Sequence, residues 1–317
     1  MTTLARFSGG LVSAIAATLA IGSWTQLKVK ADSAVLCAAY IHPGINGAVL
    51  TLFPADGPQV MLPLPSGLPA SLTLNAFGPD GKAVYVQRAD FSFEGIIKIE
   101  FKPARQSLVP GSAGLGTIWH LTISRPGGQI FLSGIDKNLR RCGTFEIDPD
   151  AGTFRTLLVG AYPDCGGGGG AISPDGKRVL SHVGEELSVR NLETDSNEVV
   201  HGIPGGPSQS DGTWPYKATW SPDGRWISTI LRDRIILIDA TDTSRRRNLG
   251  HGSVPVVWSQ DSKSLLLSTS QLRCAPSLYF ESLESLDVQT GKRSVIKSSR
   301  CEVGPGWFGW IDSDAVR

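Results

Sequence analysis

The stretches ISPDGKRVLS (172–181) and WSPDGRWIST (220–229) share one pattern: an aliphatic or aromatic anchor, a Ser-Pro-Asp-Gly turn, a basic residue and an apolar run. Turn chemistry explains the pattern. Proline presets the first turn dihedral, aspartate caps the turn with its side chain, and glycine accepts positive φ. Each stretch is therefore expected to form a strand, a tight turn and a second strand.

The pattern is an internal repeat. Further copies read FGPDGKAVYV (77–86), ISRPGGQIFL (123–132), WSQDSKSLLL (258–267) and a degraded WIDSDAV (310–316). The anchors lie 46, 49, 48, 38 and 52 residues apart along the chain. Third strands are expected at 95–101, 143–148, 186–192, 234–239 and 284–291. Four short strands per repeat at this period are typical of a β-propeller.

Six anchors predict six blades, in an all-β fold whose last blade is closed by both ends of the chain. The last copy supplies an innermost strand and then the chain stops. The segments AVLCAAYI (34–41), AVLTLF (48–53) and QVMLPL (59–64) would supply the missing second, third and fourth strands of that blade. Closure of this kind removes exposed sheet edges.

The Ser-Pro-Asp-Gly-Lys/Arg hairpins and the third strands resemble the WD-like repeats of TolB-like six-bladed propellers, over residues 33 to 317. The resemblance implies a face that receives partner peptides in its central channel, although a fold alone does not fix a function. TolB-like proteins carry an additional α/β domain before the propeller. Here the N-terminal segment leads directly into the first strand, so a role in the Tol–Pal system is not expected.

The first 31 residues form a separate segment. A charged start precedes the uncharged run 9–24, and the step Val29-x-Ala31 resembles a secretory cleavage site before Asp32. The apolar run is short for a membrane span, but the alternative of an uncleaved membrane anchor stays open. The sequence thus predicts a signal peptide or anchor over 1–31 and a propeller over 32–317, in the periplasm or outside the cell.

The net charge of +1 gives no indication of nucleic-acid binding, which usually requires a basic excess on one face. The short basic runs at Lys28 and Lys30 and at Arg245–Arg247 are expected to be solvated. The glycines of CGGGGGAISPDGK (165–177) do not match a phosphate loop, because Ala171 and Arg178 stand where a glycine and a hydroxyl are needed. Close backbone approach in a first strand is the favoured explanation of this run.

Four of the five cysteines occupy repeated places. Cys142 and Cys274 are expected between the second and third strands of their blades, and Cys165 and Cys301 just before the next first strand. Because these connections emerge on one face, the disulfides Cys142–Cys165 and Cys274–Cys301 are predicted, as an oxidising compartment permits. The alternative is a set of unconnected small core residues. Cys37 is left over as a buried free thiol.

No hydrolase or metal motif is present, so no catalytic residue, metal ligand or cofactor is predicted. His120, His182 and Glu185 could approach the channel, but packed or solvated positions are favoured over a metal site.

The longest connection, IPGGPSQSDGTWPYK (203–217), is the best candidate for recognition. Trp214 and Tyr216 are residue types that anchor interfaces, although Trp214 could instead cover the blade below it. Asp211, Arg232 and Arg234 complete the predicted binding residues. The leading hypothesis is a monomeric, non-catalytic module of the cell envelope that binds a protein or peptide. The alternatives are a lactonase-like hydrolase with a channel metal, or the sensor portion of a membrane-anchored protein.

Overall fold

The computed structural model describes residues 34–44, 47–54, 60–63, 72–88, 95–124, 128–136, 141–160, 170–183, 186–204, 218–269, 279–303 and 307–312. The chain divides into two units, Met1–Asp32 and Ser33–Arg317, and all described residues belong to the second. They form 23 β-strands and no helix. Within this described part there is accordingly no helix that could cross a membrane, and the predicted anchor at 9–24 lies outside it.

Each of the first two sheets takes its four strands in chain order. Sheet 1 comprises β4 (Leu72–Phe77), β5 (Ala83–Arg88), β6 (Ile97–Phe101) and β7 (Ala104–Leu108). Sheet 2 comprises β8 (Leu115–Ile123), β9 (Ile130–Asp136), β10 (Arg141–Asp148) and β11 (Thr153–Gly160). All neighbouring strands in these sheets pair antiparallel, as up-and-down blades require.

Three further sheets follow along the chain. Sheet 3 comprises β12 (Arg178–Val183), β13 (Glu186–Asn191) and β14 (Asn197–Pro204). Sheet 4 comprises β15 (Thr219–Trp220), β16 (Trp226–Leu231), β17 (Arg234–Asp239) and β18 (Asp242–His251). Sheet 5 comprises β19 (Ser253–Trp258), β20 (Ser264–Thr269), β21 (Tyr279–Asp287) and β22 (Arg293–Val303).

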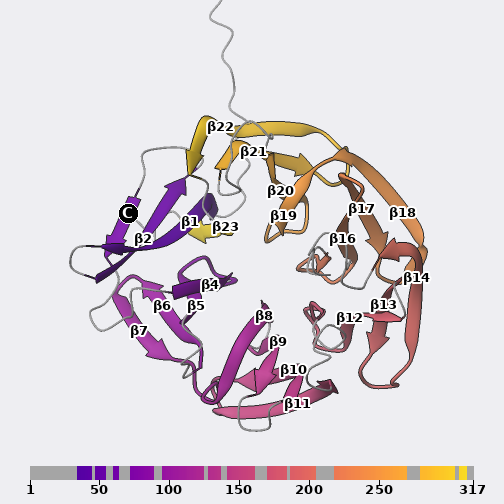
Figure 1. Cartoon of the computed structure of the whole chain (residues 1–317), viewed down its shortest axis with the longest axis horizontal. Coiled ribbons are helices and arrows are strands. Elements are labelled where there is room, and N and C mark those ends of the chain that lie inside the picture. The colour runs from indigo at the N-terminus through magenta and orange to yellow at the C-terminus, as the bar shows by residue number, and fades with distance from the viewer. Residues whose placement is uncertain are drawn as a thin grey trace, which may run out of the picture. The chain divides into compact units, whose positions relative to one another are not determined.

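Sheet 6 joins the two ends of the described chain. It comprises β23 (Trp307–Asp312), β1 (Ala34–Gly44), β2 (Gly47–Pro54) and β3 (Val60–Pro63), in that order. Strand β23 pairs with β1 from Ala34↔Asp312 to Ala39↔Trp307, and it contacts β4 and β19 of the two neighbouring sheets. Figure 1 shows the sheets following one another around a centre, with β4, β8, β19 and β23 innermost. The fold is an all-β propeller.

The described residues form five complete four-stranded blades, where the sequence predicted six. Sheet 3 has three described strands, and the start of its expected first strand, in the glycine run 166–170, falls mostly outside the described residues. After this run, Ile172 makes a single antiparallel bridge to Val179 of β12.

The core lies between neighbouring sheets, because most strands bury both faces. In β17, Ile236 and Ile238 pack with sheet 3 residues such as Leu187, whereas Ile235 and Leu237 pack against sheet 5. This alternation follows the two-residue period of a strand. Continuous apolar runs such as RIILID therefore form strands that are covered from two sides.

The repeated turn is stabilised by the same hydrogen bonds in three sheets. The hydroxyls of Ser173, Ser221 and Ser259 each donate to the aspartate two residues on. Each hydroxyl also accepts the amide five residues on, at 2.8–2.9 Å. The same aspartates accept the amide of the basic residue that follows the turn, at 3.0–3.1 Å. The predicted role of aspartate as a turn cap is confirmed.

The structure corrects one strand and explains one glycine. The fifth expected third strand, 284–291, is β21, which begins at Tyr279 and ends at Asp287. Of the glycine run, Gly170 is described: a Cβ there would overlap the carbonyl oxygen of Leu180. Close backbone approach is therefore the reason for this glycine.

Candidate binding face

The outermost strands of sheets 3 and 4, β14 and β18, show which loops of these two sheets lie on the same side of the propeller. Glu198 of β14 accepts hydrogen bonds from the amide (3.3 Å) and hydroxyl (2.6 Å) of Thr243, near the start of β18. The two strands are in contact and begin side by side, so they end on the same side. We call this side the candidate binding face. Its described residues include Glu186, His201, Arg232, Arg234 and His251.

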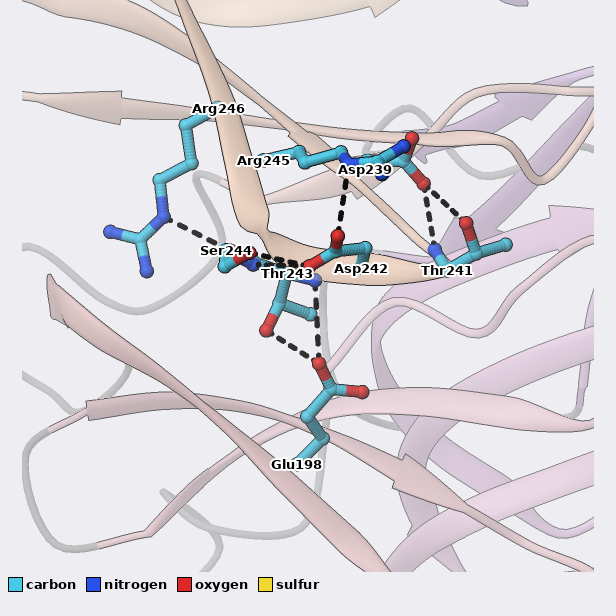
Figure 2. A network of polar contacts seen from close by, with 8 residues as sticks. All are labelled: Glu198, Asp239, Thr241, Asp242, Thr243, Ser244, Arg245 and Arg246. Carbon is cyan, nitrogen blue, oxygen red and sulfur yellow. Dashed lines mark hydrogen bonds and ion pairs between the residues drawn. The ribbon is translucent and has the colours of Figure 1, made fainter.

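Figure 2 shows that the turn before β18 is held by its own side chains. Asp239 accepts the amide and hydroxyl of Thr241, which lower the pKa of its carboxyl group. Asp242 accepts the amide and hydroxyl of Ser244 and pairs with Arg245 at 2.9 Å. Arg246 donates from Nε to the Thr243 carbonyl, and its terminal nitrogens make no contact with the residues drawn. The turn is thus fixed, and Arg246 keeps hydrogen-bond donors unused within it.

The turn between β16 and β17 presents two predicted binding residues, Arg232 and Arg234. All three residues from Arg232 to Arg234 are exposed, and φ is 47° at Arg232 and 61° at Asp233. Two consecutive residues with positive φ match the tight type I′ hairpin turn, which prefers Asn and Gly. The carbonyl of Asp233 accepts the Gly252 amide at 3.0 Å, and Arg234 pairs with His251 at the end of β18. Both arginines are accessible on this turn, and their role in binding stays a prediction.

A second polar cluster lies where β13 begins. Glu186 accepts the Gly202 amide at 2.6 Å and faces Nδ1 of His201 at 3.0 Å. The Gly202 hydrogen bond, followed by His201 and the positive charge of Arg246, lowers the pKa of Glu186. A register shift between β13 and β14 and a φ of 73° at Gly202 accompany this contact. The carboxylate thus fastens a β-bulge, and its charge is already partly compensated.

Side chains that cross between sheets give the face a rigid support. Nε1 of Trp220 donates to the Ala171 carbonyl at 2.9 Å, and Nε1 of Trp258 donates to the Ser228 hydroxyl at 3.0 Å. Arg178 donates to the carbonyls of Ala240 (2.5 Å) and Gly224 (3.3 Å), and its guanidinium lies 4.8 Å from the Trp220 ring centre. The repeated tryptophan anchor therefore bonds each of these sheets to the preceding one.

Several predicted site residues lie outside the described residues, namely Asp211, Trp214, Tyr216, Cys165 and Cys274. Cys142 is fully buried and disulfide-bonded. It lies inside β10, opposite Ile135, rather than in the preceding connection. Cys301 likewise lies inside β22 rather than after it. Both strands extend further than the apolar pattern indicated, and the two cysteine pairings stay predictions.

The histidines considered as channel ligands are placed only by their backbone. His120 lies in β8 opposite Ser133, and His182 lies in β12 opposite Leu187; Glu185 is outside the described residues. Among the described residues, no group of three His, Cys, Asp or Glu side chains could hold a metal. Sequence reasoning missed the Glu186–His201 cluster, since a β-bulge gives no sequence signal apart from its glycine.

Comparison with known proteins shows the fold. No family model matches the sequence, and no curated protein matches it significantly. TolB from Acinetobacter baumannii is 14% identical with a TM-score of 0.58, over 88% of this chain and 66% of that one. A structure of a nidogen/laminin complex is 14% identical with a TM-score of 0.51, over 82% of this chain and 91% of that one. A TolB-type protein from Agrobacterium tumefaciens is 14% identical with a TM-score of 0.50, over 85% of this chain and 91% of that one. This chain thus spans about two thirds of the first of these structures. By fold it is an all-β propeller similar to the TolB structures.

Proposed function

We propose that the chain is an exported, non-catalytic propeller that binds a protein or peptide segment in the cell envelope. The observation that carries the proposal is the β16–β17 turn, where exposed charged side chains stand on strands that are bonded to neighbouring sheets. A rigid scaffold that presents accessible side chains on short turns suits recognition. The match to a propeller structure solved as a nidogen/laminin complex supports the same class of function.

The proposal includes a six-bladed ring. Sheet 3 becomes the sixth blade if residues around Ile172 form its first strand, since Ile172 already bridges to β12. It also includes the disulfides Cys142–Cys165 and Cys274–Cys301, cleavage or anchoring of residues 1–31, and a periplasmic or secreted location. Residues 205–217, which follow β14 in the chain, would add Asp211, Trp214 and Tyr216 to the binding face.

Crosslinking mass spectrometry in cells that express the chain tests the proposal. The wild type is compared with Trp214→Ala/Tyr216→Ala and with Phe154→Ala, a control that removes an exposed aromatic side chain from β11. We expect a protein partner that the wild type and the control capture and the double variant loses, because buried aromatic residues often dominate interface energies. A partner retained by the double variant, or no partner in any sample, would contradict the proposed function.

A further inference from the structure

Sheet 4 carries a small excess of positive charge. Residues 218–251 contain six arginines and four aspartates, a net charge of +2, within a chain whose total is +1. Residues 170–204 of neighbouring sheet 3 contain three basic and six acidic residues, a net charge of −3. The excess on sheet 4 therefore does not continue onto sheet 3.

Three of the four aspartates in sheet 4 make hydrogen bonds or ion pairs within the sheet. Asp223 accepts the Ser221 hydroxyl and the Arg225 amide. Asp239 accepts hydrogen bonds from the amide and hydroxyl of Thr241. Asp242 accepts a hydrogen bond from the Ser244 amide and forms an ion pair with Arg245. Asp233, between Arg232 and Arg234, is the acidic residue of this sheet whose carboxylate makes no hydrogen bond or ion pair among the described residues.

The guanidinium groups, by contrast, keep free donors. Within the described part of the chain, the side chains of Arg232 and Arg234 make no hydrogen bond or ion pair. On β18, Arg246 uses its Nε on Thr243, and Arg247 donates one terminal nitrogen to the Gln289 carbonyl at 2.9 Å. Arginine binds carboxylates in a bidentate manner, so these free terminal nitrogens suit carboxylate ligands.

Three of these arginines lie within reach of a single extended segment. Arg234 begins β17 and Arg246 is opposite Ile238, four residues further along β17, so both project from the same face of sheet 4. Four residues of strand, about 13 Å, separate Arg234 from Ile238. Arg247 is opposite Leu237 and projects from the other face, toward sheet 5. We call Arg232, Arg234 and Arg246 the basic edge.

We propose that the basic edge binds an acidic, extended peptide segment of the partner. The inference rests on the proposed function and names the chemistry of the partner. A short segment with alternating carboxylates can lie along sheet 4 alone, whereas a long polyanion would also meet the negative charge of sheet 3. Arg232 supports a binding role further, because it holds a backbone conformation that Asn or Gly would adopt at lower cost.

Fluorescence anisotropy with the full chain tests the proposal. The probe is a fluorescein-labelled decapeptide of alternating Glu and Gly, compared with the same peptide carrying Gln or Lys in place of Glu. We expect the Glu peptide to bind at least about tenfold more tightly than the Gln peptide, with an affinity that falls as salt rises. A duplex DNA of 20 base pairs is the competing anion, and we expect it to bind more weakly than the Glu peptide.

The variant Arg232→Asn/Arg234→Gln removes two charges while Asn keeps the turn geometry. It should weaken binding of the Glu peptide about fivefold or more, as the loss of charge-assisted hydrogen bonds predicts. The control Lys263→Gln/Lys292→Gln removes the same charge from exposed turns of sheet 5 and should leave the affinity unchanged. Equal binding of Glu and Gln peptides, tighter binding of DNA, no binding, or equal loss in both variants would overturn the proposal.

The two proposals fail separately. A crosslinked partner that docks through a neutral or basic segment would overturn the acidic-segment inference and leave the binding function standing. Absence of both a crosslinked partner and peptide binding would reject both.

Discussion

Gly170 occupies a place where two backbone segments approach so closely that no side chain fits. The carbonyl of Leu180 stands where its Cβ would be. The carbonyl of Gly170 in turn accepts the hydroxyl of Ser133, which is fully buried in sheet 2, at 2.8 Å. The residue thus holds sheets 2 and 3 together through its backbone, which explains why glycine stands here.

Gly170→Ala should destabilise the propeller by about 1–3 kcal/mol, because the added methyl group forces the backbone of β12 to move. Urea unfolding followed by tryptophan fluorescence measures the change. Gly291→Ala is the matched control: it adds the same methyl group at φ +71° with no atom nearby, so it reports only the cost of positive φ. A larger loss in the control than in Gly170→Ala would contradict this explanation.

The turns between third and fourth strands repeat one device in four sheets. Asp148, Asn191, Asp239 and Asp287 each accept backbone amides two or three residues on, at 2.7–3.0 Å. Asn191 shows that a neutral amide fulfils the same role as the carboxylates. Hydrogen bonds from the Thr290 amide and hydroxyl lower the pKa of Asp287, as those from Thr241 do for Asp239.

These lowered pKa values predict a loss of stability in acid. A carboxyl group whose pKa is lower in the folded than in the unfolded state stabilises the fold above its unfolded pKa, and this contribution disappears as the pH falls through the folded value. Asp287→Asn should fold normally, as Asn191 does in sheet 3, but should show a shallower decline in melting temperature below about pH 4. Thermal unfolding from pH 6 to 2.5 measures this. An unchanged pH profile would contradict the assignment.

The elements that could be predicted are those whose chemistry is local. The Ser-Pro-Asp-Gly turns set the positions of most second and third strands, and burial on two faces accounts for runs such as RIILID. Strand β21 was placed too late because its apolar residues Phe280, Leu283 and Leu286 are three apart, which hides the alternation of a strand. Register shifts between β21 and β22 after Phe280 and after Leu283 accommodate this spacing. The Glu186 cluster and the pairing of Glu198 with Thr243 depend on contacts far apart in the sequence, which one sequence cannot reveal.

At the scale of the whole molecule, sheet 6 connects the beginning and end of the propeller unit. Strand β23 pairs with β1 in sheet 6 and also contacts β4 of sheet 1 and β19 of sheet 5. Neighbouring sheets share their cores, so the loss of one strand exposes apolar surface on the adjoining sheets as well. The propeller should therefore unfold as one cooperative unit.

Deletion of residues 307–317 removes β23 and should abolish cooperative unfolding. Deletion of residues 313–317 is the control, because it leaves β23 intact. Differential scanning calorimetry should give one transition for the full chain and the control, and a broad or strongly lowered transition for the longer deletion. A longer deletion that melts like the full chain would show that closure through β23 is unnecessary.

Pairing between β1 and β23 also governs when the molecule can be completed. Ala34 is synthesised long before Asp312, and the register places the two residues opposite each other across 278 positions of chain (312 − 34). Contacts of such sequence separation form late and slow folding. A growing chain therefore carries an open ring with unpaired strand edges, and such species are prone to aggregation. Synthesis of β23 therefore decides when the edge of β1 becomes protected from association with other chains.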